Sequence, residues 1–297
     1  DTLVRLWDLK KVGAVGCPTT GYPPAPTSGP ADPNAASIVL SGHTSIVRDL
    51  AFSPDGRWLV SAGGNGRVIR WDLLGTSPGA QFTLLVSHKQ QVRVVAISPD
   101  SRWAITGGDS AEARLWDLSA PHPSATVHVL PDHSGAVHTA AFSPDSQMLM
   151  TGGDGNLLHF WDLTRPDPEA SGITVPGQNS VIRAAVFTPN GRWLLTGGDD
   201  NLILMWDVRA GTPTAPTFIL RGHAGPIRSL DVSADSALLV SGSEDNTARA
   251  WDLTLPDPGA RSTLLPGHRG PVWAVGISPE LAPERRRIVT GSGDNSA

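Results

Sequence analysis

Residues 42–72 read GHTSIVRDLAFSPDGRWLVSAGGNGRVIRWD, and this stretch decides the fold. It holds three short runs of alternating or β-branched residues, and turn signals separate them before any helical period develops. Within it, Ser53-Pro54-Asp55-Gly56 has turn chemistry, because proline presets φ at the second turn position and glycine follows at the fourth. Together with the β-rich run at residues 37–41, the stretch predicts four short strands.

The same unit recurs along the chain with a fixed period. It closes on a Trp-Asp pair that occurs six times, and the last five pairs are spaced by 45 residues each. The six pairs are Trp7-Asp8, Trp71-Asp72, Trp116-Asp117, Trp161-Asp162, Trp206-Asp207 and Trp251-Asp252. A single unit cannot bury both of its faces, so neighbouring units must stack. A repeated four-stranded unit predicts an all-β propeller whose blades are these units.

The order of motifs resembles the WD40-repeat family. Each unit has Gly-His, then Ser-Pro-Asp-Gly or a variant of it, then Ser/Thr-Gly-x-x-Asp, then Trp-Asp, and the resemblance covers nearly the whole chain. It implies a ring of blades around a central channel, used as a platform for partners. Linkers such as Pro166-Asp-Pro-Glu and Pro256-Asp-Pro-Gly, with the Ala/Pro/Arg-rich composition, look like WD40 arrays of large multidomain bacterial proteins.

Counting strands predicts six four-stranded blades. We label the strands of a blade a to d, with strand c ending in Trp-Asp. The segment from Val272 to Gly293 supplies strands a and b, and the N-terminus supplies strands c and d. We therefore expect the last blade to be closed by the N-terminal strands. The chain reads as a piece of a longer protein, so seven blades are the alternative if the parent chain continues.

We expect residues 1–297 to form a single WD40 β-propeller domain with one insertion. The interval from Asp8 to His43 is 19 residues longer than in the other repeats, and residues 10–37 contain six prolines. Such a composition predicts an exposed loop between strands c and d. A proline-rich ligand for a partner is the alternative reading of this insertion.

Four polar or aromatic positions recur in the same register of several units: a histidine, a hydroxyl residue, an acid or amide, and a tryptophan. The histidine, hydroxyl and acid are also the residue types of a hydrolase active site. An enzyme needs one activated nucleophile, not one in every blade. The resemblance implies instead a structural tetrad of hydrogen bonds within a blade, and we expect no catalytic residue. The tetrads are His43, Ser61, Asn65 and Trp71; His223, Ser241, Asp245 and Trp251; and His268, Thr290 and Asp294 with Trp7. The sets are uneven, since Ser110 and Gly155 occupy acid positions and Gln178 replaces a histidine.

Other chemical motifs give no site. The chain has no Gly-x-x-x-x-Gly-Lys-Ser/Thr phosphate loop. Four histidines, His122, His128, His133 and His138, lie within 17 residues. The register puts them on different loops and strands, so a shared zinc site is not expected. We expect no metal and no cofactor.

We expect the binding site on the surface where the side chains differ from one repeat to the next. In this family, partner contacts lie at the start of strand a and in the b–c turn, and we call this edge the rim. Its first set of positions is Arg48, Arg93, His138, Arg183, Arg228 and Trp273, and the positions two before include Ile46 and Gln91. Arginine and tryptophan are enriched at binding hot spots. The prediction is a hot spot centred on Arg48 and Trp273.

A competing interpretation is that acids neutralise this rim. The b–c turn carries Asp109, Asp154, Asp199 and Glu244 in four units and Gly64 and Gly293 in the other two. The acids are expected beside the rim's basic residues, which leaves Arg48 the least compensated.

The leading hypothesis is a non-catalytic protein–protein interaction scaffold in a larger signalling or regulatory protein. The alternatives are a structural spacer or oligomerisation module, and an enzymatic propeller. A net charge of −5, from 23 basic and 28 acidic residues, gives no strong pull toward nucleic acid or membrane. The partner is expected to be a protein or peptide, including other domains of the same chain. Cys17 is the only cysteine, and with the missing Asn-x-Ser/Thr sequon this favours a cytoplasmic location.

Overall fold

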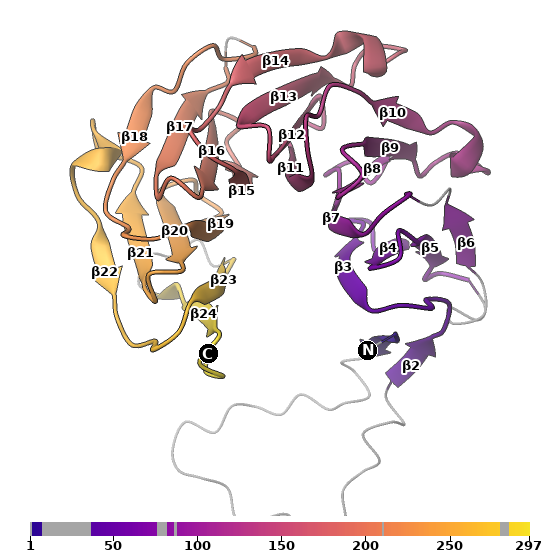
Figure 1. The fold of residues 1–297 in the computed structure, drawn as a ribbon, viewed down its shortest axis with the longest axis horizontal. Helices are drawn as coiled ribbons and strands as arrows, with labels where there is room; N and C mark the ends of the chain where they lie inside the picture. Colours follow the sequence, from indigo (N-terminus) through magenta and orange to yellow (C-terminus); the bar gives the residue numbers. More distant parts are fainter. Residues whose placement is uncertain (1, 8–36, 76–81, 86–87, 210, 280–284) are drawn as a thin grey trace, which may run out of the picture.

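The computed structural model of the protein describes residues 2–7, 37–75, 82–85, 88–209, 211–279 and 285–297. The predicted insertion at 10–37 lies outside these ranges, except for Ser37. The described residues form five four-stranded and two two-stranded antiparallel sheets. These sheets follow one another around an open arc (Figure 1). The predicted all-β propeller architecture is therefore confirmed.

Each four-stranded sheet uses four strands that are consecutive in the chain, and we call these sheets blades 1 to 5. Blade 1 is β3 (Val47–Phe52), β4 (Trp58–Gly63), β5 (Val68–Asp72) and β6 (Phe82–Leu85). Blade 2 is β7 (Val92–Ile97), β8 (Trp103–Gly108), β9 (Ala113–Asp117) and β10 (His128–Leu130). Blade 3 is β11 (Val137–Phe142), β12 (Met148–Gly153), β13 (Leu157–Asp162) and β14 (Ile173–Pro176).

Blade 4 is β15 (Ile182–Phe187), β16 (Trp193–Gly198), β17 (Ile203–Asp207) and β18 (Phe218–Leu220). Blade 5 is β19 (Ile227–Val232), β20 (Leu238–Ser243), β21 (Ala248–Asp252) and β22 (Thr263–Leu265). Short 3-10 helices lie in the connections at η2 (Pro123–Ala125), η3 (Glu169–Ser171) and η4 (Pro258–Ala260). The first strand of each blade lies nearest the middle of the arc (Figure 1).

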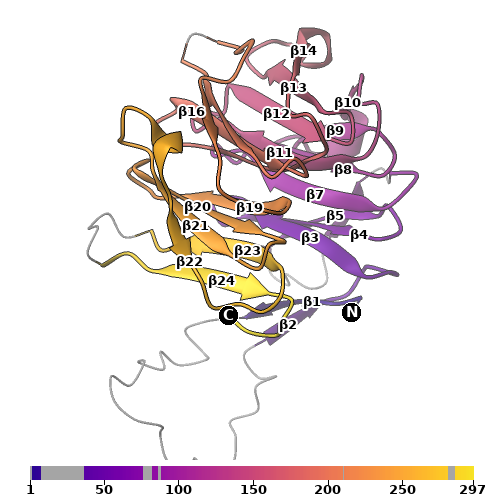
Figure 2. The same cartoon turned by 60° about the vertical axis from the view of Figure 1, so that its left-hand side comes forward.

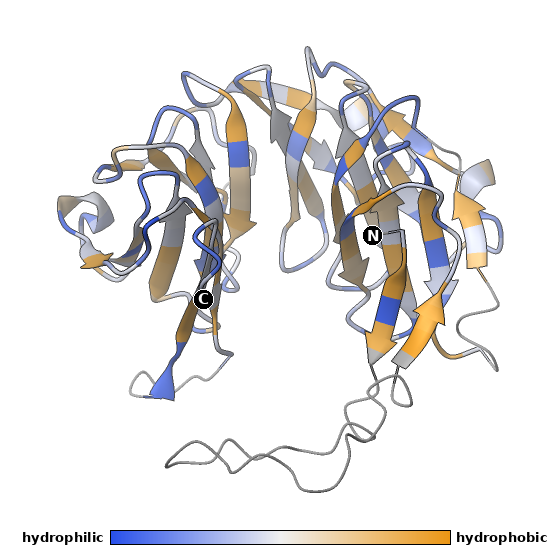
Figure 3. Cartoon of the chain, turned by 60° about the horizontal axis from the view of Figure 1, so that its bottom comes forward, coloured by the Kyte–Doolittle hydropathy of each residue, from blue (hydrophilic) through white to orange (hydrophobic). Residues whose placement is uncertain are grey.

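The core lies between the blades, in contacts that we call seams. Each blade is covered on both faces, so its second strand is buried along its length, as in β4, β8 and β16. Hydrophobic residues accordingly gather on the strands and hydrophilic residues on the turns (Figure 3). The Trp of every Trp-Asp pair in blades 1 to 5 is at most 1% exposed: Trp71, Trp116, Trp161, Trp206 and Trp251.

Polar side chains also cross the seams and fix the register of neighbouring blades. The carboxylate of Asp49 accepts a hydrogen bond from the Val95 amide at 2.7 Å. Asp231 accepts one from the Ile277 amide at the same distance. The first strands joined by these bonds cannot slide past each other without breaking them. The side view shows the sheets stacked face to face along the arc (Figure 2).

The two-stranded sheets occupy the two ends of the arc. β1 (Val4–Trp7) pairs with β2 (Ser37–Leu40), and β23 (Val272–Ile277) pairs with β24 (Ile288–Ser292). We call them the N-terminal and C-terminal half-blades. Within the described residues β1 is not joined to β24, and the two half-blades lie apart (Figure 1).

The expected closure of the last blade by the N-terminal strands is therefore not what this structure has. Strand register shows that two half-blades complement each other. It does not set the angle by which each blade turns about the axis, and this angle decides whether the ends meet. The number of blades in a closed ring stays a prediction.

The open ends leave normally buried positions in contact with solvent. Val289 on β24 is 60% exposed. The residues in the same register position of blades 1 to 5 are all fully buried: Val60, Ile105, Met150, Leu195 and Val240. On the other side of the opening, Phe52 on β3 is 52% exposed, whereas its counterparts Phe142 and Phe187 are 9% and 6% exposed.

A pair of matched substitutions tests whether the arc is open in solution. We expect Val240→Asp to cost several kcal/mol, because it buries an unpaired carboxylate. Val289→Asp should change the free energy of unfolding by less than about 0.5 kcal/mol, since its site is exposed. Urea denaturation of both variants measures the difference. Comparable losses would mean that the half-blades close on each other and bury Val289.

Candidate functional site

The rim lies where each first strand begins and each second strand ends. Arg93, His138, Arg183 and Arg228 occupy the second position of β7, β11, β15 and β19, and Trp273 holds the same position of β23. A register shift falls at this position in every pairing of first and second strands, so the rim residue itself has no paired residue on the second strand. Such an irregularity re-aims a side chain relative to the regular pleat, so these residues extend toward the b–c turn.

Each of these basic side chains contacts the acid of its own blade. Arg93 pairs with Asp109. His138 Nε2 lies 2.7 Å from Asp154 Oδ1. Arg183 donates to Asp199 from Nη2 at 2.7 Å and from Nε at 3.0 Å. Arg228 donates to Glu244 from Nε at 2.9 Å. The neutralised rim, which was the competing interpretation, thus matches the geometry of blades 2 to 5.

The pairs are linked from blade to blade. Arg228 Nη1 is 3.7 Å from Asp199 of the preceding blade. Arg183 Nη1 is 3.2 Å from His138 Nε2. The hydrogen bond from Arg183, with its charge, lowers the pKa of Asp199, and the same bond raises the pKa of Arg183. Burial lowers the pKa of His138. The rim of blades 3 to 5 is therefore a fixed network with little free positive charge.

Trp273 continues this network onto the C-terminal half-blade. Its ring lies under the guanidinium of Arg228, with 5.6 Å between the Arg228 Cζ atom and the ring centroid. A Cβ at Gly293 would come 2.9 Å from Trp273 Nε1, so any larger residue there would require the indole to shift. The indole is nevertheless 50% exposed. Sequence reasoning missed this support from Arg228 and Gly293, although the 45-residue spacing places Arg228 on the adjoining blade.

The structure does not bring Arg48 and Trp273 together. Arg48 is on β3 and Trp273 on β23, at opposite ends of the arc (Figure 1). Arg48 is exposed and belongs to no ion pair among the described residues. It borders a cavity of about 360 Å³ between β1 and β3. Ile46 is 41% exposed and Gln91 is half-buried on the same rim.

The tetrad of blade 5 is a directional chain of hydrogen bonds. Trp251 Nε1 donates to Ser241 Oγ at 2.9 Å, and Ser241 Oγ lies 2.8 Å from His223 Nε2. His223 Nδ1 is 2.8 Å from Asp245 Oδ2. Burial lowers the pKa of His223, so the ring is neutral, and its Nδ1–H donates to the carboxylate. Nε2 is then left to accept from the Ser241 hydroxyl.

The other blades carry shorter versions of this chain. In blade 1, His43 and Trp71 both hydrogen-bond to Ser61, at 2.7 and 2.8 Å. Asn65 does not bond to His43, because its side-chain amide donates to Thr44. In the C-terminal half-blade, His268 Nε2 is 2.7 Å from Thr290 and its Nδ1 is 3.3 Å from Asp294. The side chain of Trp7, the expected fourth member, lies outside the described residues.

Blade 4 uses an amide where the others use an imidazole. Gln178 is 3% exposed, and its Nε2 donates to the Leu202 carbonyl at 2.9 Å and to Asp200 at 3.3 Å. Trp206 still donates to Thr196 at 3.0 Å. The Trp-to-hydroxyl bond is thus common to blades 1 to 5, while the group that reaches it from the Gly-His position varies.

The geometry of Ser241, His223 and Asp245 has the order of a nucleophile, a base and an orienting acid. Ser241 has no exposed surface and His223 is 8% exposed, so a substrate has no access to the hydroxyl. Five similar hydroxyls are buried in the same way, at Ser61, Thr106, Thr151, Thr196 and Ser241. This placement suits bracing of the blade rather than nucleophilic attack.

Three of the four clustered histidines have separate partners, and the third pair, His138 with Asp154, is described above. His133 Nε2 is 2.8 Å from Thr151, and His128 Nδ1 is 3.3 Å from Glu169. The described residues contain no group of three or more His, Cys, Asp or Glu side chains that could hold a metal ion. None of the described helices is long and apolar enough to cross a membrane.

Comparison with known proteins bears on these repeats directly. The family model "WD domain, G-beta repeat" matches residues 36–72, 79–117, 124–162, 171–207 and 214–252, which together make up more than half of the chain. The chain belongs to the WD40-repeat family. Domains of this family are generally non-catalytic interaction modules.

Curated relatives match short segments only. WD repeat-containing protein 36 of Homo sapiens is 54% identical over 34 residues, which are 11% of this chain and 4% of that protein. Ribosome biogenesis protein erb1 of Aspergillus clavatus is 48% identical over 42 residues, which are 14% of this chain and 5% of that protein. The matches span about one repeat, so they carry the repeat and not the activity of those proteins.

Unequal tetrads predict unequal stability effects. His223→Ala should lower the free energy of unfolding by about 2–3 kcal/mol, because it removes both hydrogen bonds of a buried imidazole, to Ser241 and to Asp245. Gln178→Ala should cost about 1 kcal/mol, since its amide makes one good bond and its Oε1 has no partner among the described residues. Thermal denaturation measures both variants. Equal shifts in Tm would contradict the role assigned to His223.

The buried histidines predict a loss of stability in mild acid. Burial lowers the pKa of His88 and of His133 to about 4. Between pH 6.5 and about 4 the unfolded chain therefore binds protons that the folded chain does not. The stability contributed by these neutral rings is complete above pH 6.5 and is lost as the pH falls toward 4. Tm measured from pH 7.5 to 4.5 should fall accordingly.

The control for this pH dependence is already present in blade 4, where Gln178 occupies the histidine position. His88→Gln combined with His133→Gln should flatten the fall in Tm, because an amide does not titrate. A weaker slope will remain from His43 and His223, whose pKa values burial also lowers. An unchanged slope in the double variant would assign the acid sensitivity to other groups.

Proposed function

We propose that this protein is a non-catalytic scaffold that binds a protein or peptide on its rim. The observation that carries the proposal is Trp273, an indole that is 50% exposed although Arg228 and Gly293 hold it in place. An aromatic ring that is fixed before binding loses little conformational entropy when a partner covers it. Tryptophan and arginine are also the residues that most often dominate binding energies at protein interfaces.

The charge distribution suggests what kind of partner the rim accepts. The arginines of blades 2, 4 and 5 are already paired with acids, so net positive charge is not the main attraction. Partner recognition then rests on apolar contact with Trp273 and on hydrogen bonds to the remaining guanidinium N–H groups. Arg48, at the other end of the arc, is the basic rim residue best placed to meet an acid of the partner.

The setting that we propose is a larger signalling or regulatory protein in the cytoplasm, whose other domains are additional partners of the rim. The composition and the Pro-Asp-Pro linkers favour a bacterial source, whereas the curated relatives above are eukaryotic and lend this no support. We do not expect nucleic acid as a partner, because the net charge is −5.

Affinity capture from cells that make the protein tests this function. The amount of each protein that crosslinks to the wild type should fall at least tenfold with Trp273→Ala. It should fall by a smaller factor with Arg48→Glu. Leu264→Ala is the matched control, since Leu264 is a 46% exposed apolar residue on β22, away from the rim. Capture of the same proteins in the same amounts by Trp273→Ala would refute the rim as the binding site.

A further inference from the structure

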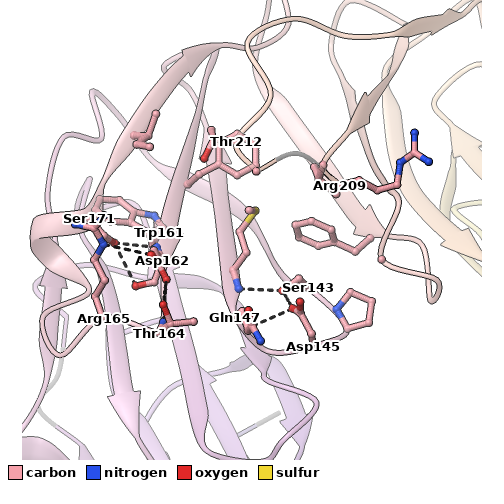
Figure 4. A pocket seen from close by; sticks show the side chains of 18 of the residues that line it. Ser143, Asp145, Gln147, Trp161, Asp162, Thr164, Arg165, Ser171, Arg209 and Thr212 are labelled. Carbon is pink, nitrogen blue, oxygen red and sulfur yellow. Dashed lines mark hydrogen bonds and ion pairs between the residues drawn. The ribbon is translucent and has the colours of Figure 1, made fainter.

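A groove of about 860 Å³ lies between blades 3 and 4, at the end of the strands opposite the rim. Its walls are the a–b turns of the two blades, the ends of β13 and β17 and the connections that follow them (Figure 4). Met148, Phe160 and Phe187 form its apolar floor, and Asp145 and Asp162 lie on its polar wall. The rim lies where the first strands begin, and the groove lies where they end. The two surfaces are therefore separate.

At the groove, blade 3 lacks a tryptophan that both of its neighbours have. The first position of the second strand is Trp58, Trp103 or Trp193 in blades 1, 2 and 4, Leu238 in blade 5 and Met148 in blade 3. Those three indoles are 9%, 5% and 6% exposed. Each one packs in its seam against the Trp-Asp strand of the next blade. Met148 fills less of the same space between blades 3 and 4.

A basic residue accompanies each of the three tryptophans. The Cζ atoms of Arg57, Arg102 and Arg192 lie 4.4, 4.5 and 4.4 Å from the ring centroids of the following tryptophans. The same arginines lie 3.3 to 3.7 Å from the Asp of their own Trp-Asp pair. In blade 3 this residue is Gln147, so Asp162 lacks the equivalent arginine. Its ion pair is with Arg165 at 3.2 Å, and the side chain stays 44% exposed.

A second tie is missing from the same seam. In three seams a turn amide donates to a serine hydroxyl of the next blade at 3.0 Å: Asp55 to Ser101, Asp100 to Ser146 and Asn190 to Ser236. In the seam between blades 3 and 4, the position that would accept the hydrogen bond from the Asp145 amide is Gly191, which has no hydroxyl. Its φ is +69°, and a Cβ at this position would have no heavy atom within 4 Å, so its turn leaves the mouth of the groove open.

The groove also leaves an apolar wall residue uncovered. Ile173 on β14 is 50% exposed. Its counterparts His128 and Phe218 hold the edges of Trp103 and Trp193, with ring centroids 5.9 and 5.8 Å apart. Two arginines line the mouth as well, but each is tied to an acid of its own blade, Arg165 to Asp162 and Arg209 to Asp207 at 2.8 Å.

We propose that this groove binds an extended segment of a partner protein in which an arginine precedes an aromatic residue. The aromatic ring would occupy the space that tryptophan fills in the other seams, against Met148, Phe160 and Ile173. The arginine would stack on that ring and reach Asp162, taking the place of the 64% exposed Arg165 as its partner. The Arg-Trp pairs of the described seams are already packed, so none of these is the occupant, and we assign it to a partner protein.

A peptide probe tests the proposal directly. The probe is a fluorescein-labelled Asp-Gly-Arg-Trp-Leu-Val, which copies residues 55–60, and the readout is fluorescence polarisation with the whole chain. We expect saturable binding to the wild type. Replacing Trp by Ala, or Arg by Glu, in the peptide should weaken binding at least tenfold. No saturable binding, or equal binding of the Trp-to-Ala peptide, would overturn the proposal.

Two variants of the protein locate the binding site. Met148→Trp should fill the groove as in the other seams and weaken binding at least tenfold, with Tm unchanged or raised. Gly191→Ser should supply the missing hydroxyl and weaken binding as well. Gly56→Ser is the matched control, because Gly56 has φ of +73° and equally open surroundings in blade 1. Wild-type affinity in both groove variants, with melting showing that they are folded, would overturn the site.

Discussion

One buried hydroxyl in the second strand holds each blade together. The tryptophan of the third strand donates to it in blades 1 to 5, over distances from 2.8 to 3.2 Å. An indole N–H that is removed from water needs such an acceptor, because an unmet donor in the core costs more than the bond returns. The hydroxyl therefore permits a large aromatic ring to be buried in every blade. The seams depend on those rings.

The seams show how a repeat protein acquires individual sites. Where a blade keeps Arg, Trp and Ser at the standard register positions, the contact with its neighbour is filled. Where blade 3 has Gln147 and Met148, and blade 4 has Gly191, a groove remains in an otherwise similar contact. The rim follows the same logic, because the indole of Trp273 lies against Gly293, where four other units have an acid. In our proposals the departures from the repeat carry the specificity, while the repeat itself carries the stability.

Much of the fold could be predicted because the signals are local and repeated. The 45-residue spacing of Trp-Asp, with turn residues at fixed offsets, determines the four-stranded sheets. The pairing of Arg93 with Asp109 or of Arg228 with Glu244 follows from register alone, since both members sit at fixed positions of one blade. Relations between the two ends of the chain could not be obtained in this way. They depend on small rotations that accumulate over five blades, so the expected proximity of Arg48 and Trp273 failed.

The groove was also absent from our sequence predictions, although its signal is present in the repeats. Aligning the units by their turns shows Met148 opposite three tryptophans and Gly191 opposite serines. That contrast predicts a smaller residue, but not whether the surrounding backbone collapses to fill the space. Only the packing of Phe160, Phe187 and Ile173 around that space shows that it does not.

The two ends of the arc share a property that the second and third strands of blades 1 to 5 do not have. One long side of β1 and one of β24 carry backbone N–H and C=O groups that no described strand pairs. Such bare edges are the usual starting points for sheet extension between molecules. Because one is a third-strand type and the other a second-strand type, copies of this chain can join head to tail, and a contact of that kind does not close by symmetry. A contact of that kind would involve the two ends of the arc, where Arg48 on β3 and Trp273 on β23 also lie.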